Sequence, residues 1–258
     1  MKKLFNATLL IALSTSSFAM TQEQREIQEK ENLKLLEQMG LPVPGSGIKF
    51  VDRSALNLSE EDLLKGQREE TEMRDKGYIT TYANRAQELI NLESLIKKRP
   101  FTSKKKLNPM DTDIMPHVED IQLAFKYQSL DQQKSLRSSG TALHYLAAAP
   151  QGGFHKDLGG WSGVAQFFKV PTVGVCDYSI MNVKASNTAA WLVQEDVQYL
   201  VNNKPSFLRV EGSDDSGYLY QVKWYDDIEY HELQCANMSY SLSLTDSLIQ
   251  LAKKIDIG

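Results

Sequence analysis

The segment 160–163 (GWSG) is the part of this chain that most resembles a hydrolytic site. It is similar to a nucleophile elbow, in which a serine sits on a sharp turn and glycine follows two residues later. Here Val164 stands where that glycine is needed, one place after Gly163. His155 and Asp157 are near Ser162 in sequence, which does not place them near it in space. We therefore expect a glycine loop and no catalytic residue, with a periplasmic hydrolase using the loop near Ser162 as the alternative.

Metal-ligand spacing is also missing from the sequence. The chain has four histidines: His117, His144, His155 and His231. None lies three or four residues from another, and no Cys-x-x-Cys pair occurs, so the spacing does not favour zinc. The acidic clusters at 111–113 and 211–215 lack the twelve-residue calcium loop and are typical of turns. The sequence therefore predicts neither a metal nor a cofactor.

The two cysteines, Cys176 and Cys235, both fall in segments with the composition of strands. In an oxidising compartment a single pair of cysteines is more often bonded than free, so we expect a disulfide. A bond between them closes a loop of roughly 60 residues, which stabilises the fold by about 4 kcal/mol in the chain-entropy model. A reactive thiol is the alternative.

Three aromatic residues near the end of the chain, Tyr218, Tyr220 and Trp224, are spaced by even numbers. Side chains two apart in a strand share one face of the sheet, so the three are expected together. If exposed, they form a candidate interaction surface for protein or glycan, as in a periplasmic binding protein. If buried, they are core residues and cross-strand pairs, which is the more common arrangement.

The first nineteen residues have the build of a secretory signal peptide. Lys2 and Lys3 precede an apolar run at 4–13, and Ser17 and Ala19 are the small residues that a signal peptidase reads, so cleavage after Ala19 is expected. The residue directly after Ala19 is Met20 and not cysteine, so no lipid anchor is expected there. No later stretch of about 18 apolar residues predicts a transmembrane segment. We expect an exported protein, periplasmic or associated with the outer membrane.

The formal charge of −4 is unevenly distributed along the chain. Residues 174–258 carry six Lys and Arg against twelve Asp and Glu. An acidic region repels phosphate groups, so no nucleic-acid partner is expected.

Periodicity and breakers divide the chain into three parts: a leader at 1–19, a helical extension with a Pro/Gly linker at 20–115, and an α+β domain at 116–258. The extension comprises a charged helix at 22–39, a linker at 41–47, and two helices at 59–76 and 83–98 that could form a hairpin with an apolar face left for a partner. For the domain we expect strands near 172–184, 206–211, 218–225 and 228–238, and helices at 187–201 and from Thr245. This order predicts a mostly antiparallel sheet with packed helices.

The leader, the stretch GGWSGVAQFFKVP and the closing ELQCANMSYSLSL are similar to exported proteins of Legionella-type bacteria. The overall build resembles accessory subunits of the outer-membrane core of type IVB (Dot/Icm) secretion systems. The resemblance covers no diagnostic motif and transfers no site residue. The charged helix on its linker, the helical pair and the disulfide-linked domain predict a non-enzymatic structural or interaction protein of the cell envelope, with other envelope proteins of a multi-subunit assembly as partners. The resemblance favours the same function.

Overall fold

The fold is taken from a computed structural model, which describes residues 47–56, 58–98, 114–133, 136, 142–186 and 189–257. The expected signal peptide, the charged helix at 22–39 and nearly all of the linker lie outside this part of the chain, as does the acidic cluster at 111–113. Within the described residues, no helix is both long and apolar enough to cross a membrane.

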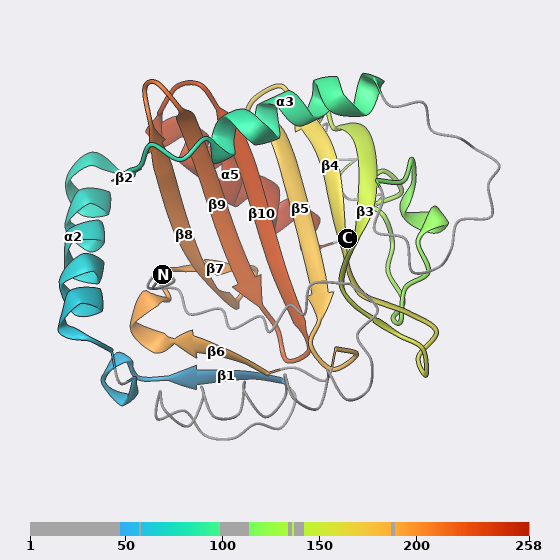
Figure 1. The fold of residues 1–258 in the computed structure, drawn as a ribbon, viewed down its shortest axis with the longest axis horizontal. Coiled ribbons are helices and arrows are strands. Elements are labelled where there is room, and N and C mark those ends of the chain that lie inside the picture. Colours follow the sequence, from blue (N-terminus) through green and yellow to red (C-terminus); the bar gives the residue numbers. More distant parts are fainter. Residues whose placement is uncertain are drawn as a thin grey trace.

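A large sheet forms the centre of the structure (Figure 1). Its strands are β2 (Ile79–Thr80), β3 (His144–His155), β4 (Gly160–Val170), β5 (Gly174–Asn182), β7 (Tyr199–Val201), β8 (Lys204–Ser213), β9 (Gly217–Tyr225) and β10 (Glu229–Asn237). They are arranged in the order β2–β8–β9–β10–β5–β4–β3, with β7 paired to β8 beside this path. All pairs are antiparallel except β2 with β8.

A second, two-stranded sheet lies below the ends of the large one (Figure 1). It pairs β1 (Gly47–Val51) in parallel with β6 (Ala189–Val193), so segments far apart in sequence meet here. Leu192 of β6 packs with Tyr225 and Tyr230 in a small apolar cluster. The pair therefore closes the end of the large sheet at which the β9–β10 hairpin turns.

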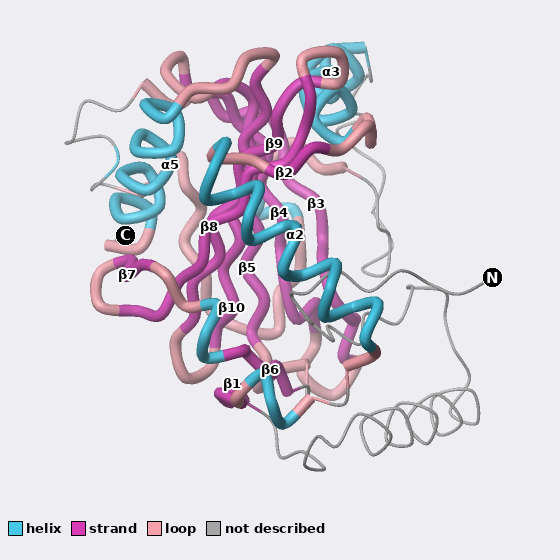
Figure 2. The backbone as a smooth tube through the Cα atoms, turned by 90° about the vertical axis from the view of Figure 1, so that its left-hand side faces the viewer, coloured by secondary structure: helices cyan, strands magenta, loops and turns pink. Residues whose placement is uncertain are grey.

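One face of the large sheet is covered by α5 (Leu242–Ile255) (Figure 2). The helix begins at Ser241, whose side chain accepts a hydrogen bond from the backbone of Ser243. Its buried residues recur at helical spacing: Thr245, Leu248, Leu251, Ala252 and Ile255. They pack with the inward-facing residues of the central strands to form the main core.

The opposite face carries α3 (Arg85–Lys98), which lies across β5, β9 and β10 (Figures 1 and 2). Ala86 of this helix packs on Leu219 and Ala236. The helix α2 (Glu60–Lys76) lies outside the β2–β8 edge, and none of its residues is buried. The described part of the expected 20–115 extension is therefore joined to the sheets. Its strands β1 and β2 pair with β6 and β8, α3 packs on the large sheet, and α2 lies at the edge.

The expected α+β class and the mostly antiparallel sheet are confirmed. The turn at 212–217 joins β8 to β9 as expected. The helix expected at 59–76 is α2, which is capped by Ser59 at its start. It ends at Gly77, whose φ of 82° is in the left-handed region. The helix expected from Thr245 begins three residues earlier, at Leu242.

Two expectations about secondary structure were wrong. The segment expected as a helix at 187–201 contains β6 and β7, because Ala190 to Val193 pair with β1 and tertiary pairing overrides local propensity. The expected glycine loop is the strand β4. Its glycines allow close approach of neighbouring chain, since a Cβ on Gly163 would lie 2.7 Å from the carbonyl oxygen of Ile180.

Candidate functional site: the Asp226–Glu229–His231 cluster

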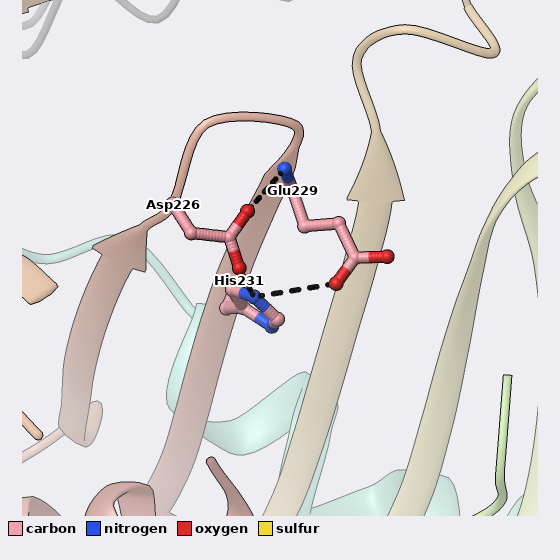
Figure 3. A group of neighbouring side chains, drawn as sticks. All are labelled: Asp226, Glu229 and His231. Atoms are coloured by element: carbon pink, nitrogen blue, oxygen red, sulfur yellow. Dashed lines mark hydrogen bonds and ion pairs between the residues drawn. The ribbon is translucent and has the colours of Figure 1, made fainter.

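The turn of the β9–β10 hairpin brings three side chains of ligand type together (Figure 3). Asp226 follows the last residue of β9, and Glu229 and His231 lie two residues apart at the start of β10. The Asp226 carboxylate accepts hydrogen bonds from the backbone N–H groups of Ile228, at 3.1 Å, and Glu229, at 2.8 Å. Asp226 therefore stabilises the turn and is also one of the three residues of the cluster.

Nε2 of His231 faces both carboxylates. It lies 3.7 Å from Oδ2 of Asp226 and 3.9 Å from Oε2 of Glu229. The His231 side chain is 6% exposed, whereas the carboxylate side chains are 29% and 24% exposed. The imidazole is thus anchored in the protein, and the two carboxylates border solvent.

The ring of His231 is held in position by aromatic neighbours on the α5 face of the sheet. It stacks on Trp224 with a centroid distance of 5.0 Å and an interplanar angle of 2°. It also lies parallel to Tyr178, whose Oη is 2.8 Å from Nδ1 of His231. Burial raises the pKa of Tyr178 well above its usual range, so the phenol stays neutral and can donate or accept this hydrogen bond.

A cation borders the cluster as well. Nζ of Lys204 lies 3.2 Å from Oδ2 of Asp226 and 2.7 Å from Oδ1 of Asp256. Burial acts to raise the pKa of Asp226, but His231, the two backbone N–H groups and Lys204 outweigh it and hold that pKa well below its usual range. Burial raises the pKa of Glu229. Asp226 is therefore the permanently ionised member of the cluster.

A second polar group lies on the opposite face of the sheet, around Asp177 and Glu232. Burial raises the pKa of Asp177 to about 7, and the Glu232 carboxylate acts in the same direction. Glu232 accepts hydrogen bonds from Gln221, Gln234 and Tyr230. Since the carboxylate oxygens of Glu232 already accept hydrogen bonds from neighbouring side chains, we interpret the residues around Asp177 and Glu232 as a structural network.

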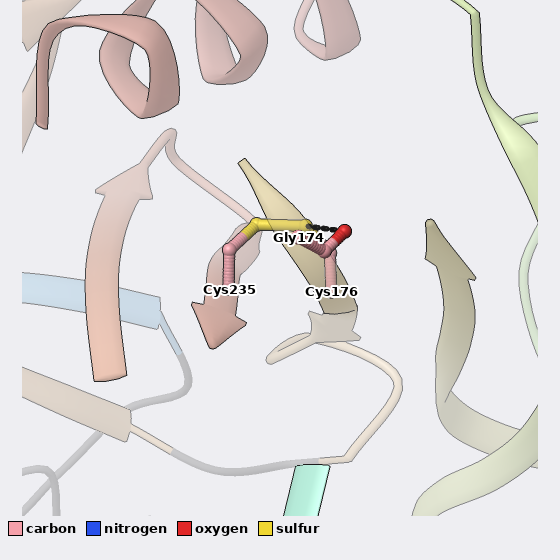
Figure 4. The surroundings of a disulfide bond; sticks show 3 residues. All are labelled: Gly174, Cys176 and Cys235. Atoms are coloured by element: carbon pink, nitrogen blue, oxygen red, sulfur yellow. Dashed lines mark hydrogen bonds between the residues drawn. A yellow bond between two sulfur atoms is a disulfide. The ribbon is translucent and has the colours of Figure 1, made fainter. Parts of the chain in front are cut away.

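The expected disulfide between Cys176 and Cys235 is confirmed (Figure 4). The two residues face each other directly in the β5–β10 ladder, with Cα atoms 4.1 Å apart, and both are fully buried. The bond therefore joins two central strands inside the core.

The three aromatic residues considered as an interaction surface are buried: Tyr218 is 2% exposed, Tyr220 1% and Trp224 0%. They share one face of β9, as their spacing predicts, but that face lies under α5 and belongs to the main core. Their polar atoms are hydrogen-bonded inside the fold, for example Nε1 of Trp224 to Asp256 at 2.8 Å. The interaction-surface interpretation was wrong, and the core alternative is the correct one.

Ser162 is fully buried in β4, and its Oγ accepts a hydrogen bond from the backbone N–H of Gly153 at 3.1 Å. A nucleophilic serine must be reachable by substrate. The buried position therefore argues against Ser162 as the nucleophile of the hydrolase alternative.

The cluster at the hairpin was missed from the sequence. Its signal is the pattern Asp-x-x-Glu-x-His over 226–231, which has no histidine pair and so fails the usual test for zinc spacing. The three side chains meet because Asp226 lies in the hairpin turn, directly before β10. Glu229 and His231 are two residues apart in β10 and so point to the same side of the strand.

No family model, curated protein or solved structure matches this chain.

Proposed function

We propose that this chain is an exported, non-enzymatic interaction protein that works in the bacterial cell envelope. The disulfide supports an oxidising compartment, because buried structural disulfides form and persist outside the reducing cytosol. The leader-like composition of residues 1–19 is consistent with the same compartment.

The main support for an interaction role is the exposure of α2. None of its 17 residues is buried, although it is an ordered helix capped at both ends. Leu63 and Leu64 are 43% and 51% exposed on it. A helix gains most of its stability from packing, so a helix with no fully buried residue and two exposed leucines is suited to pack against a partner.

Polar links hold α2 in place at the edge of the sheet. Glu69 pairs with Arg209 at 2.9 Å, with side chains that are 14% and 13% exposed, and Glu70 pairs with Arg53. These contacts present the leucines on a positioned helix, which lowers the entropy cost of binding. The more specific expectation, an accessory subunit of a type IVB secretion core, stays a prediction that depends on the sequence resemblance.

Site-specific photo-crosslinking in intact cells tests this function. A photoreactive residue at Leu64 is expected to give a discrete crosslinked product with an envelope protein. Leu158, in the β3–β4 turn and 50% exposed, is the matched control and is expected to give none. If neither position crosslinks and the protein leaves envelope extracts as a monomer, the proposed function is wrong.

A further inference from the structure

The Asp226–Glu229–His231 cluster has the separations expected of ligands around one ion. A hydrogen bond between Nε2 of His231 and either carboxylate is excluded by distances of 3.7 and 3.9 Å. Bonds of about 2.0–2.2 Å from zinc to nitrogen and oxygen place two tetrahedral ligand atoms about 3.4 Å apart. The two distances from Nε2 exceed this separation by about 0.3 and 0.5 Å, and the three ligand atoms all lie within 4.8 Å of one another.

An independent observation points to a ligand at the same place. Nε2 of His231 is buried and has no hydrogen-bond partner, although Nδ1 of the same ring is bonded to Tyr178. Buried polar atoms almost always have a partner, so we expect Nε2 of His231 to bind one. It is directed between the carboxylates of Asp226 and Glu229, where a cation would complete its environment.

Contacts with neighbouring residues also orient His231 and Asp226, as is common for metal ligands. Metal-binding histidines commonly donate their second N–H to a neighbouring acceptor, which fixes the ring, and Tyr178 is placed to accept from Nδ1. Stacking on Trp224 prevents rotation of the ring. Two backbone N–H groups orient Asp226. The ligand atoms of His231 and Asp226 are therefore oriented before any ion binds.

We propose that Asp226, Glu229 and His231 bind one divalent transition-metal ion, with Zn²⁺ as the best match to the donors. One imidazole nitrogen with two carboxylate oxygens suits zinc, and three protein ligands leave a fourth position for water. Calcium and magnesium prefer sites made only of oxygen. The partial exposure of both carboxylates places the open position on the solvent side.

This inference goes beyond the proposed function and does not depend on it. The binding of Zn²⁺ at the hairpin and the docking of α2 involve separate parts of the fold, since α2 lies at the β2–β8 edge (Figure 1).

Lys204 competes with the ion for Asp226. Its Nζ is 3.2 Å from the same Oδ2 that faces His231, and it has a second partner in Asp256 at 2.7 Å. When an ion binds, Lys204 can keep Asp256 and release Asp226. Removing this charge with Lys204→Met should therefore strengthen binding of Zn²⁺ several-fold.

Isothermal titration of the chelator-treated full chain, with its disulfide formed, measures the site directly. We expect one equivalent of Zn²⁺ to bind, at least tenfold weaker binding in Glu229→Gln and Asp226→Asn, and no comparable binding of Mg²⁺. Substitution with Co²⁺ should give the absorption bands of a tetrahedral site. His231→Gln should also weaken binding, and Glu229→Gln keeps the test valid if the loss of the packed ring prevents folding.

The matched control is Asp227→Asn, which removes the same charge from an exposed residue of the same turn. It should bind Zn²⁺ as the unaltered chain does. The proposal is overturned if the unaltered chain binds no Zn²⁺, if Glu229→Gln binds as tightly as the unaltered chain, or if Asp227→Asn weakens binding as much as Glu229→Gln does.

Discussion

Oη of Tyr178 lies 2.8 Å from Nδ1 of His231, on the face of the sheet that α5 covers, and this contact turns Nε2 of the same ring toward Asp226 and Glu229. The phenol can donate to Nδ1 when Nε2 carries the proton and accept from Nδ1 when Nε2 binds an ion. The same pair of residues therefore accommodates the cluster both with and without a metal.

Tyr178→Phe removes this contact while it keeps the ring that stacks on Trp224 and His231. We expect binding of Zn²⁺ to weaken by about tenfold or more, because residues that orient a ligand histidine typically contribute 10–100-fold in affinity. Titration calorimetry measures the change. Circular dichroism should show an unaltered fold, and unchanged affinity would mean that Tyr178 does not position His231.

The bond between Cys176 and Cys235 closes a loop with a sequence separation of 59 residues. Reduction should lower the free energy of unfolding by about 4 kcal/mol, because the reduced unfolded chain regains the entropy of that loop. Urea unfolding with and without a phosphine reductant measures the difference. A difference below about 1 kcal/mol would contradict the chain-entropy account of this disulfide.

The stability of the fold should fall as the pH rises from about 4 to about 7, through the contribution of Asp177. Burial raises the pKa of Asp177 to about 7 in the folded chain, whereas an unfolded aspartate loses its proton near pH 3.9, as is usual for Asp. In this window the folded chain holds a proton that the unfolded chain has lost, so raising the pH favours unfolding.

Asp177→Asn removes this effect and keeps an acceptor for the hydroxyl of Ser179, which donates to Oδ1 of Asp177 at 3.2 Å. The variant should match the unaltered chain near pH 4 and exceed its stability above pH 7. Asp215→Asn, in an exposed turn, is the control and should not alter the pH profile in this way. Thermal unfolding from pH 4 to pH 8 measures the profiles, and parallel profiles for all three chains would refute the role of Asp177.

The attachment of α2 depends on the pair between Glu69 and Arg209, whose side chains are 14% and 13% exposed. Glu69→Gln should speed hydrogen exchange throughout α2, since a covered charge pair contributes about 1.5–3 kcal/mol to the local structure. The control Asp75→Asn breaks the pair of Asp75 with Arg74, whose side chains are 57% and 73% exposed. It should have little effect on hydrogen exchange in α2. Equal exchange rates in the two variants would show that α2 is held by other contacts.

Much of the carboxyl-terminal fold follows from the sequence because its signals are local. The turn at 212–217 combines glycine with Asp and Ser, and the buried positions of α5 recur at helical spacing. The strand β6 could not be predicted in this way. Its residues pair with β1, which lies more than a hundred positions earlier, and nothing near Ala190 reports on that partner.

The cluster at the hairpin was missed for a related reason. Asp226 and His231 are close because a turn and one strand position them, and tests of sequence spacing look mainly for histidine or cysteine pairs. For Tyr218, Tyr220 and Trp224 the sequence identified the shared face but not what covers it, since α5 begins some twenty residues after them. Period-two spacing does not tell an exposed face from a buried one.

Mass spectrometry of the protein recovered from the cell envelope, after alkylation without reduction, tests the central claim most directly. An exported, disulfide-linked protein should begin at Met20 and carry no alkyl group on Cys176 or Cys235. A protein that retains its first nineteen residues and is alkylated at both cysteines would contradict the claim.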